Sequence, residues 1–317
     1  MQPFPSASVQ FIGVRSRQLE GTYPGDGTMG AWGTTALRVI KGWGVPDESA
    51  WPYDGDISHW PPTEPPGIDQ LAKLHRILAY QRARSIDECR RFLAGGHPVI
   101  AAFEIDNSWF SAPSGVIPVP SQVTPVIGSH AIDLVGYDDE KGRFIVRNSW
   151  GIHWGYKGHG YLPYEYLSER FLEGWVIPSD DPRQRVNFSS GVQVSEWGIP
   201  DLLGGILHGF EIIDGTNNEI VGWAFAVERD GYLDVEELFV RPLWRGFGYG
   251  RRLTTSLKSK ATVLRRPLRL WIAHCDADSL DKPQTKAVFD QIGLEISPSH
   301  AKWAPYVGVS EIQQGGI

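Results

Sequence analysis

The sequence is poor in cysteine, with only Cys89 and Cys275 among 317 residues. So low a content excludes a disulfide scaffold of the kind that small secreted domains use, and it favours a reducing compartment. No apolar run approaches the ~20 residues that a membrane-spanning helix needs. The first five residues contain neither the basic segment nor the apolar stretch of a signal peptide. We therefore expect a cytoplasmic protein without a membrane partner.

Positive charge is also scarce, since 30 Lys and Arg stand against 37 Asp and Glu, a formal net charge of −7. Nucleic-acid binding depends on clustered positive charge that neutralises phosphates, and the sequence contains no long basic run. We therefore expect no nucleic-acid partner. We also expect no metal cofactor.

The length and the apolar pattern indicate two domains. Single hydrophobic cores stop growing at roughly 250–300 residues, and apolar periodicity weakens between Ser179 and Pro200, where Ser, Asp, Pro, Arg and Asn accumulate. We predict a first domain over residues 1–180, a linker over 181–202 and a second domain over 203–317.

The first domain is expected to mix helices with strands. Periodicity predicts helices over residues 9–19, 32–43 and 84–94, a buried strand over 98–103, and a hairpin of His130–Tyr137 with Arg143–Asn148. Cys89 lies on the apolar face of the third helix, so we interpret it as a core residue.

The second domain has an α/β pattern. We predict strands at Leu207–Ile213, Ile220–Val227 and Tyr232–Val240, a helix at about Tyr249–Ala261, a strand at Leu268–Cys275 and a helix at about Lys282–Ile292. Strands followed by helix, strand and helix are typical of an α/β domain.

A histidine and an asparagine occupy the two strands of the predicted hairpin. His130 opens one strand and Asn148 closes the other, so the two can come close in space. An asparagine amide can hold an imidazole in one orientation, which is the role of the third group in nucleophilic triads. Trp150 and Trp154 could cover that hydrogen bond. A histidine alone would more often be structural, but this one comes with Asn-Ser-Trp-Gly-x-x-Trp-Gly.

Residues from about 5 to 178 resemble the papain-like cysteine peptidase family. The resemblance is carried by Asn148-Ser149-Trp150-Gly151, by Gly158-x-Gly160-Tyr161-Leu162-Pro163-Tyr164 and by Trp51-Pro52-Tyr53. It implies an α+β fold with helices beside an antiparallel sheet, and a peptide or protein substrate. It also implies that His130 is the general base and Asn148 its orienting residue.

The catalytic cysteine of that family is not found at its expected place. It lies ~130–150 residues before the histidine and asparagine, and counting back from His130 reaches Met1 or beyond. Neither its Cys-Gly-x-Cys-Trp motif nor its oxyanion glutamine is present. Three interpretations stay open: a shortened version of a full peptidase, a degenerate fold used for binding, or a separate polypeptide that supplies the cysteine.

A glycine-rich loop joins the strand that ends at Val240 to the next predicted helix, and it reads Arg245-Gly246-Phe247-Gly248-Tyr249-Gly250. Glycines let backbone N–H groups approach a pyrophosphate, and the helix N-terminus adds partial positive charge. Arg245, Arg251 and Arg252 could neutralise phosphate charge. A structural turn is the alternative. A dinucleotide-binding fingerprint is less suitable, because this loop follows several strands instead of the first strand of a βαβ unit.

Residues from about 203 to 310 resemble the GNAT family of N-acetyltransferases. Val240-Arg241-Pro242, the spacing of Arg245, Gly248 and Gly250, and the segment from Ala287 to Leu294 carry the resemblance. It implies a GNAT fold and acetyl-CoA as cosubstrate. By the resemblance, the cofactor-binding residues are Phe239 and Val240 for the pantetheine arm, and Arg245, Gly246, Phe247, Gly248, Tyr249, Gly250 and Arg251 for the pyrophosphate.

Acetyl transfer needs a base for the amine and often an acid for the thiolate. Glu236 and Glu237 are the candidate bases, and we expect only one to face the cleft because neighbours on a strand point to opposite faces. The place where the family often has a tyrosine acid holds Phe289, and Tyr306 is a possible substitute.

Three hypotheses follow. The first is an acetyl-CoA-dependent N-acetyltransferase for an amine, peptide or protein acceptor, fused to a papain-like region without its nucleophile. The second is a cysteine peptidase whose nucleophile is encoded upstream or supplied in trans, regulated by an acetyl-CoA-binding module. The third is a non-catalytic binding or scaffold protein. The sequence makes no prediction of the oligomeric state.

Overall fold

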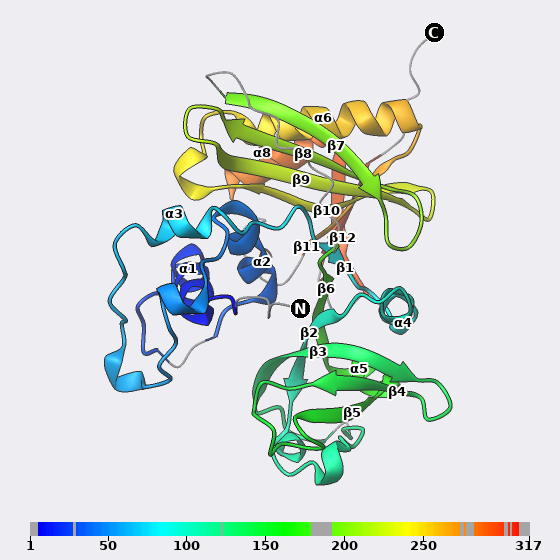
Figure 1. Ribbon diagram of the computed structural model, residues 1–317. Coiled ribbons are helices and arrows are strands. Elements are labelled where there is room, and N and C mark those ends of the chain that lie inside the picture. The colour runs from blue at the N-terminus through cyan, green and yellow to red at the C-terminus, as the bar shows by residue number, and fades with distance from the viewer. Residues whose placement is uncertain are drawn as a thin grey trace.

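The computed structural model describes residues 6–27, 30–121, 123–178, 192–272, 276, 282–300, 304 and 306–310. Two sheets dominate it (Figure 1). A six-stranded sheet has the strand order β1-β6-β2-β3-β4-β5, and a seven-stranded sheet has the order β12-β13-β11-β10-β9-β8-β7. We call residues 6–178 the N-terminal region and residues 192–310 the C-terminal region.

The N-terminal region contains helices α1 to α5 and the six-stranded sheet. Its helices are α1 (Val9–Glu20), α2 (Gly33–Gly42), α3 (Ile68–Ala72), α4 (Ile86–Ala94) and α5 (Tyr164–Arg170). Its strands are β1 (Gln81–Arg82), β2 (Val99–Ile105), β3 (Gly128–Asp138), β4 (Arg143–Arg147), β5 (His159–Pro163) and β6 (Phe171–Val176). Short 3-10 helices are η1 (Glu48–Ala50), η2 (Ile57–His59), η3 (Asn107–Trp109) and η4 (Pro113–Gly115). The predicted helices, strand and hairpin of this region are confirmed.

The C-terminal region packs helices α6 and α8 on one face of the seven-stranded sheet (Figure 1). Its elements are β7 (Val192–Pro200), β8 (Ile206–Asp214), β9 (Glu219–Arg229), β10 (Tyr232–Val240), η5 (Pro242–Trp244), α6 (Tyr249–Leu264), β11 (Leu268–Ile272), α8 (Pro283–Ile292), β12 (Leu294–Pro298) and β13 (Tyr306–Ser310). Neighbouring strands are antiparallel except β10 and β11, which are parallel.

One predicted boundary needs correction. Strand β7 lies inside the range predicted as a linker (181–202) and pairs with β8 along its whole length, from Val192 opposite Asp214 to Pro200 opposite Ile206. The polar residues that weaken the apolar pattern alternate with apolar ones here, as in a strand with one solvated face. The second sheet therefore begins earlier in the chain than residue 203.

The two regions share a hydrophobic core on the face of the seven-stranded sheet opposite α6. Leu37, Tyr80 and Trp175 of the N-terminal region pack in one buried cluster with Trp223 and Phe225 of β9. The Lys41 side chain is 0% exposed and forms an ion pair with Glu211, which is 3% exposed. Because this core is continuous, the regions are packed as one body rather than as separate modules.

Helix α2 starts on a carboxylate that another element supplies. Its N-cap residue, Trp32, makes no side-chain capping bond. Instead Glu173 of β6 accepts hydrogen bonds from the backbone N–H groups of Gly33 (2.6 Å) and Thr34 (3.1 Å), and from the Thr34 hydroxyl (2.6 Å). A buried carboxylate at a helix N-terminus satisfies free donors and complements the helix dipole. Glu173 thus joins α2 to the six-stranded sheet.

The substitution Glu173→Gln is expected to lower the free energy of unfolding by about 1–3 kcal/mol, because one of the two accepting oxygens becomes an amide that cannot accept. Urea unfolding measures this. Glu104→Gln is the matched control: Glu104 is 42% exposed and lies 3.6 Å from Arg170, so its loss should cost less than about 1 kcal/mol. Equal effects for the two variants would contradict the capping role.

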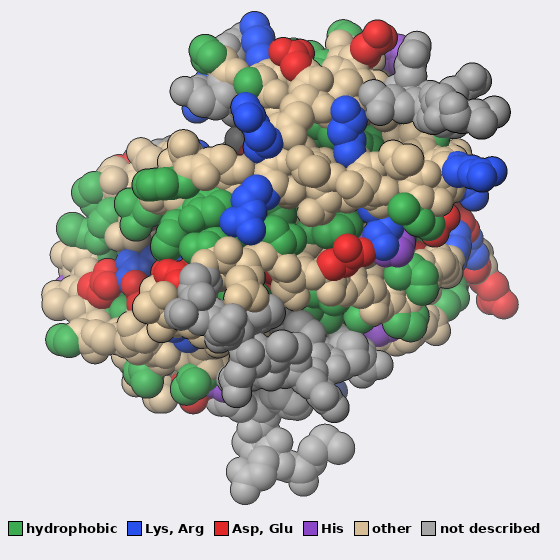
Figure 2. All heavy atoms as spheres, turned by 90° about the horizontal axis from the view of Figure 1, so that it is seen from above, with side chains coloured by type: hydrophobic (Ala, Val, Ile, Leu, Met, Phe, Trp, Pro, Cys, Tyr) green, Lys and Arg blue, Asp and Glu red, His purple; other side chains and the backbone are tan. Residues whose placement is uncertain are grey.

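Within the described ranges, no helix combines the length and apolar character that crossing a bilayer requires. In the view from above, Lys and Arg side chains are spaced over the visible face instead of gathering in one patch (Figure 2).

Candidate active site

His130 and Asn148 lie together, as the hairpin pattern predicts. His130 is on β3, and Asn148 follows β4. The ring nitrogen Nε2 of His130 lies 2.8 Å from Oδ1 of Asn148. The same oxygen accepts the backbone N–H of Ser149 at 2.8 Å, and the backbone N–H of Asn148 donates to the Gly158 carbonyl at 2.9 Å. The backbone N–H and the side-chain oxygen of Asn148 are therefore both held by hydrogen bonds.

This arrangement fixes the tautomer of the histidine. The Ser149 N–H can only donate, so the atom that receives it is the amide oxygen of Asn148. Nε2 must then be the donor of the His130–Asn148 bond, and in the neutral ring Nδ1 carries the lone pair. An imidazole held in this way can accept a proton at Nδ1 without losing its orienting hydrogen bond.

Aromatic side chains surround the pair. The Trp150 ring lies 4.6 Å from the His130 ring at an interplanar angle of 30°, and Trp109 meets it edge-on at 6.0 Å. Trp154 contacts Trp150 instead (5.9 Å) and donates its Nε1–H to the Trp109 carbonyl at 2.7 Å. The expectation that Trp150 covers the pair is thus supported directly, whereas Trp154 supports the covering residues.

Trp109 and Phe110 are two site residues that the sequence analysis did not select. Both come from the turn around η3, directly after the buried strand β2. Phe110 is 62% exposed and stacks on Trp150 with ring centroids 5.0 Å apart. Ile127 (45%) and Ile152 (73%) are also exposed, one shortly before His130 in the chain and the other shortly after Asn148. Two adjacent aromatics after a buried strand were the available signal.

Burial lowers the pKa of His130, and the hydrogen bond to Asn148 opposes that shift in part. The ring is therefore neutral near pH 7 and ready to act as a base. Because the unfolded chain takes up this proton first as the pH falls, the contribution of His130 to stability is complete above about pH 6.5 and is lost as the pH falls through the folded-state pKa.

An NMR titration of the His130 ring is expected to give a midpoint below about 6.5, the ordinary value. In Asn148→Ala the midpoint should fall further, because the substitution removes the bond that raises the pKa of His130. A midpoint above 7, or an upward shift in Asn148→Ala, would contradict this description of the site.

Cys89 is not placed to act as a nucleophile. Its side chain is 0% exposed and lies in the core of the N-terminal region. Burial, with a smaller contribution from Glu88, raises the pKa of its thiol to about 12, so the reactive thiolate is not available near neutral pH. The prediction that Cys89 is a core residue is confirmed. Cys275 lies outside the described residues.

The predicted cofactor loop is exposed between η5 and α6. Gly246 (φ 88°) and Gly248 (φ 80°) adopt left-handed conformations, and Gly248 is the N-cap of α6. No described atom lies within 4 Å of the place where a Cβ of either glycine would be. The loop therefore leaves backbone N–H groups at the helix N-terminus open to approach by an anion.

Arg245 is anchored beside this loop. Its Nε–H donates to the Val240 carbonyl at 3.0 Å, and its guanidinium lies 5.6 Å from the centroid of the Phe239 ring. Phe247 is 70% exposed, and Arg251 is exposed in the first turn of α6. Within the described residues, the parallel pairing of β10 with β11 covers only Leu233–Val235 opposite Leu268–Leu270. The structure thus brings the predicted cofactor-binding residues to one end of β10.

Comparison with known proteins identifies the family of the N-terminal region. A family model described as papain family cysteine protease matches residues 17–167. Xylellain, a cysteine protease from Xylella fastidiosa, aligns with 33% identity over 55% of this chain and 70% of that chain, with a TM-score of 0.50. The chain belongs to the papain family of cysteine proteases.

Other similar proteins add detail. An uncharacterised peptidase C1-like protein of Acanthamoeba polyphaga mimivirus is 31% identical over 182 residues, which are 53% of this chain and 57% of that protein. The chain spans about half the length of the curated relatives it matches. A Klebsiella pneumoniae structure assigned provisionally as an acyl-CoA N-acyltransferase aligns with 33% of this chain and 72% of its own, at 19% identity and a TM-score of 0.28. These findings show a papain-like α+β fold for the N-terminal region (residues 6–178), which we now call the papain-family region. The C-terminal region is a second, sheet-rich region.

The structure contradicts the roles expected for Glu236 and Glu237. A β-bulge between Val235 and Glu237 shifts the register of β10. Both carboxylates therefore point toward the papain-family region, whereas regular strand geometry would place them on opposite faces of the sheet. Glu236 (3% exposed) accepts from the Arg84 guanidinium at 2.6 Å, and Glu237 (4% exposed) accepts from Arg38 at 2.9 and 3.0 Å. Both are therefore buried carboxylates of the interface, and neither is open to a substrate amine.

Tyr80 adds a further bond to Glu237, because its hydroxyl donates to the carboxylate at 2.9 Å. Burial and the Glu237 charge raise the pKa of Tyr80, so this phenol stays protonated. Phe289 stands where the acetyltransferase family often has its tyrosine acid, and Tyr306 is the possible substitute. Both side chains are half-buried against the core of the C-terminal region.

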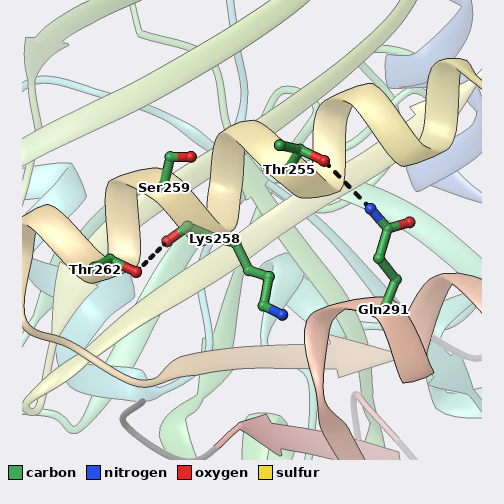
Figure 3. Close-up of a pocket in the computed structure, with 5 residues that line it drawn as sticks. All are labelled: Thr255, Lys258, Ser259, Thr262 and Gln291. Atoms are coloured by element: carbon green, nitrogen blue, oxygen red, sulfur yellow. Dashed lines mark hydrogen bonds between the residues drawn. The ribbon is translucent and has the colours of Figure 1, made fainter. Parts of the chain in front are cut away.

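A shallow groove of about 530 Å³ lies between α6 and α8 (Figure 3). It is lined by Thr255, Lys258, Ser259, Thr262 and Gln291. The hydroxyls of Thr255 and Thr262 donate to carbonyls of their own helix, and Gln291 donates to the Thr255 hydroxyl at 3.3 Å. Three of its five lining side chains are thus engaged in hydrogen bonds within α6 or between α6 and α8. No cluster of three or more His, Cys, Asp or Glu that could hold a metal ion occurs in the described part of the chain.

Proposed function

We propose that the papain-family region carries the base and the orienting residue of a cysteine peptidase, and that the thiol nucleophile comes from a segment outside residues 1–317. That segment is either upstream in the same gene product or part of another chain. The observation that supports this most directly is the His130–Asn148 bond of 2.8 Å, whose tautomer leaves Nδ1 as the proton acceptor.

The chemistry follows from that geometry. Nδ1 of His130 takes the proton of the incoming thiol, and the thiolate attacks the carbonyl carbon of a peptide bond. The imidazolium, held by Asn148, then gives its proton to the departing amine as the C–N bond breaks. Water hydrolyses the resulting thioester with His130 again as base. Trp150 covers the ring and limits competition from water for the His130–Asn148 bond.

The exposed apolar side chains beside the pair support a contact surface at this place. Phe110, Ile127 and Ile152 are all more than two-fifths exposed. Phe110 stacks on Trp150, and the two isoleucines are close to His130 and Asn148 in the chain. Exposed apolar groups near a polar site often mark a place where another segment packs. A segment that carries the thiol, or the substrate peptide itself, would cover them.

The test uses the longest natural gene product that contains residues 1–317, assayed on a panel of peptidyl coumarin amides. His130→Ala is expected to lower the hydrolysis rate by about 10²–10⁴, the usual range for loss of a general base. His59→Ala is the control, because His59 is 65% exposed and pairs only with surface aspartates among the described residues. Full activity in His130→Ala would refute the proposal. No cleavage of any peptide by this gene product would refute an upstream thiol and favour a binding role.

A second function is favoured by the open loop at the start of α6. We propose that Arg245–Gly250 binds an acyl-CoA, with the loop amides and Arg245 and Arg251 at the pyrophosphate. When bound, acetyl-CoA would supply an acetyl thioester. Because Glu236 and Glu237 are engaged by arginines, acetyl transfer to an amine needs another base, and this loop is better suited to ligand binding than to catalysis.

A further inference from the structure

An arginine of the papain-family region binds two carboxylates of the C-terminal region, one on β10 and one beyond β11. Arg38 of α2 forms paired hydrogen bonds with Glu237 of β10 (2.9 and 3.0 Å) and with Asp276, just beyond β11 (2.7 and 2.9 Å). Its side chain is 9% exposed. Paired arginine–carboxylate bonds are directional as well as strong. Arg38 thus joins Glu237 of β10 to Asp276 through one guanidinium, a contact that we call the Arg38 clamp.

Arg38 also lies next to the proposed acyl-CoA loop. Its guanidinium is 5.0 Å from the centroid of the Phe239 ring, and that of Arg245 is 5.6 Å from the same centroid. Two cations against one ring repel each other. Burial, and secondarily the Arg38 charge, lower the pKa of Arg245. An anion that neutralises Arg245 would remove this repulsion and favour the Arg38 contacts.

Arg38 lies on α2, and α2 is connected to the His130 site through Glu173 and the strands of the six-stranded sheet. Its N-terminus is bound by Glu173 of β6. Strand β6 pairs with β2, and β2 pairs with β3, where Phe103 lies opposite His130. These contacts connect α2 to the strand that carries His130, so a change in the stability of α2 is expected to change the stability of that sheet.

From these contacts we propose that the papain-family region senses occupancy of the Arg245–Gly250 loop through Arg38. Bound acyl-CoA strengthens the Arg38 clamp and stabilises α2, and a well-ordered α2 in turn raises the affinity of the loop for its ligand, since such coupling is reciprocal. This inference rests on the proposed binding of acyl-CoA at the loop.

Hydrogen–deuterium exchange of the full chain, with coenzyme A as the probe, tests the coupling. Coenzyme A is expected to slow exchange in residues 33–42 by about fivefold or more, the lower end of typical allosteric coupling. In Arg38→Ala the response should be lost, because the side chain that joins the two carboxylates is gone. In Arg38→Lys it should be reduced, because an ammonium cannot form paired bonds with each carboxylate. Circular dichroism checks that each variant is folded. Lys73→Ala removes an interface ion pair to Glu219 (3.2 Å) that does not involve Arg38, and it should keep the response.

Calorimetry with coenzyme A separates the two ways in which the proposal can fail. If coenzyme A binds but exchange in residues 33–42 does not change in the unaltered chain, or if Arg38→Ala responds fully, the coupling is refuted and the binding function stands. If no binding is measured, the proposed function of the loop is refuted, and the coupling with it.

Discussion

Replacing Lys41 with methionine is expected to lower the free energy of unfolding by about 3–5 kcal/mol, because removing one partner of a buried ion pair leaves a poorly balanced buried charge. Lys41 of α2 and Glu211 of β8 are 0% and 3% exposed, and they join the two regions of the chain. The Lys41 ammonium also lies 5.6 Å from the centroid of the Phe225 ring in the shared core.

Urea unfolding measures the loss, and two further variants interpret it. The double substitution Lys41→Met with Glu211→Leu should recover most of the stability, since apolar replacements of a buried pair are often neutral. Lys141→Met removes an exposed lysine (62%) that lies 3.7 Å from Asp138, and it should cost less than about 1 kcal/mol. If the regions instead unfold in separate transitions that Lys41→Met leaves unshifted, they do not form one cooperative unit.

Gly248→Trp is expected to weaken coenzyme A binding by at least about 100-fold, which corresponds to ~2.8 kcal/mol. Gly248 has a φ of 80° and is the N-cap of α6, so a side chain there strains the backbone and projects from the loop that the pyrophosphate is expected to approach. Isothermal titration calorimetry measures the affinity.

Gly231→Trp provides the matched control for this loss. Gly231 has a φ of 85° and also has no described atom within 4 Å of its Cβ position. It lies in the turn between β9 and β10, at the opposite end of β10 from Val240. The strain is similar but the loop is untouched, so binding should be retained. Equal losses in both variants would show that the Gly248 effect comes from destabilisation and not from the loop.

Local patterns in the sequence predicted much of the fold, the His130–Asn148 pair and the open loop at Arg245–Gly250. Apolar periodicity gave the helices and central strands, because one buried face of each element is a local property. The His130–Asn148 pair was predictable because the hairpin itself brings the two residues together. Alternating apolar and polar residues in Val192–Pro200 were also visible in the sequence. The polar residues around this segment hid the edge strand, which was predicted as part of a linker.

The roles of Glu236 and Glu237 could not be predicted in the same way. Strand alternation placed them on opposite faces, whereas a bulge turns both toward the papain-family region. Their partners Arg38 and Arg84 are separated from them by 199 and 152 positions in the chain. Such a contact depends on how two regions pack, and no local pattern encodes it. The acetyltransferase hypothesis had these two glutamates as its candidate bases, and the family match supports the peptidase alternative better.

The most direct test of the central claim is to find which cysteine reacts. The longest natural gene product is treated with an epoxysuccinyl peptide, which alkylates activated thiols, and the labelled peptide is mapped by mass spectrometry. We predict one label on a cysteine outside residues 1–317, lost in His130→Ala, and none on Cys89, whose thiol is buried with a pKa of about 12. A label on Cys89 or Cys275, or a label that persists in His130→Ala, would contradict the proposal.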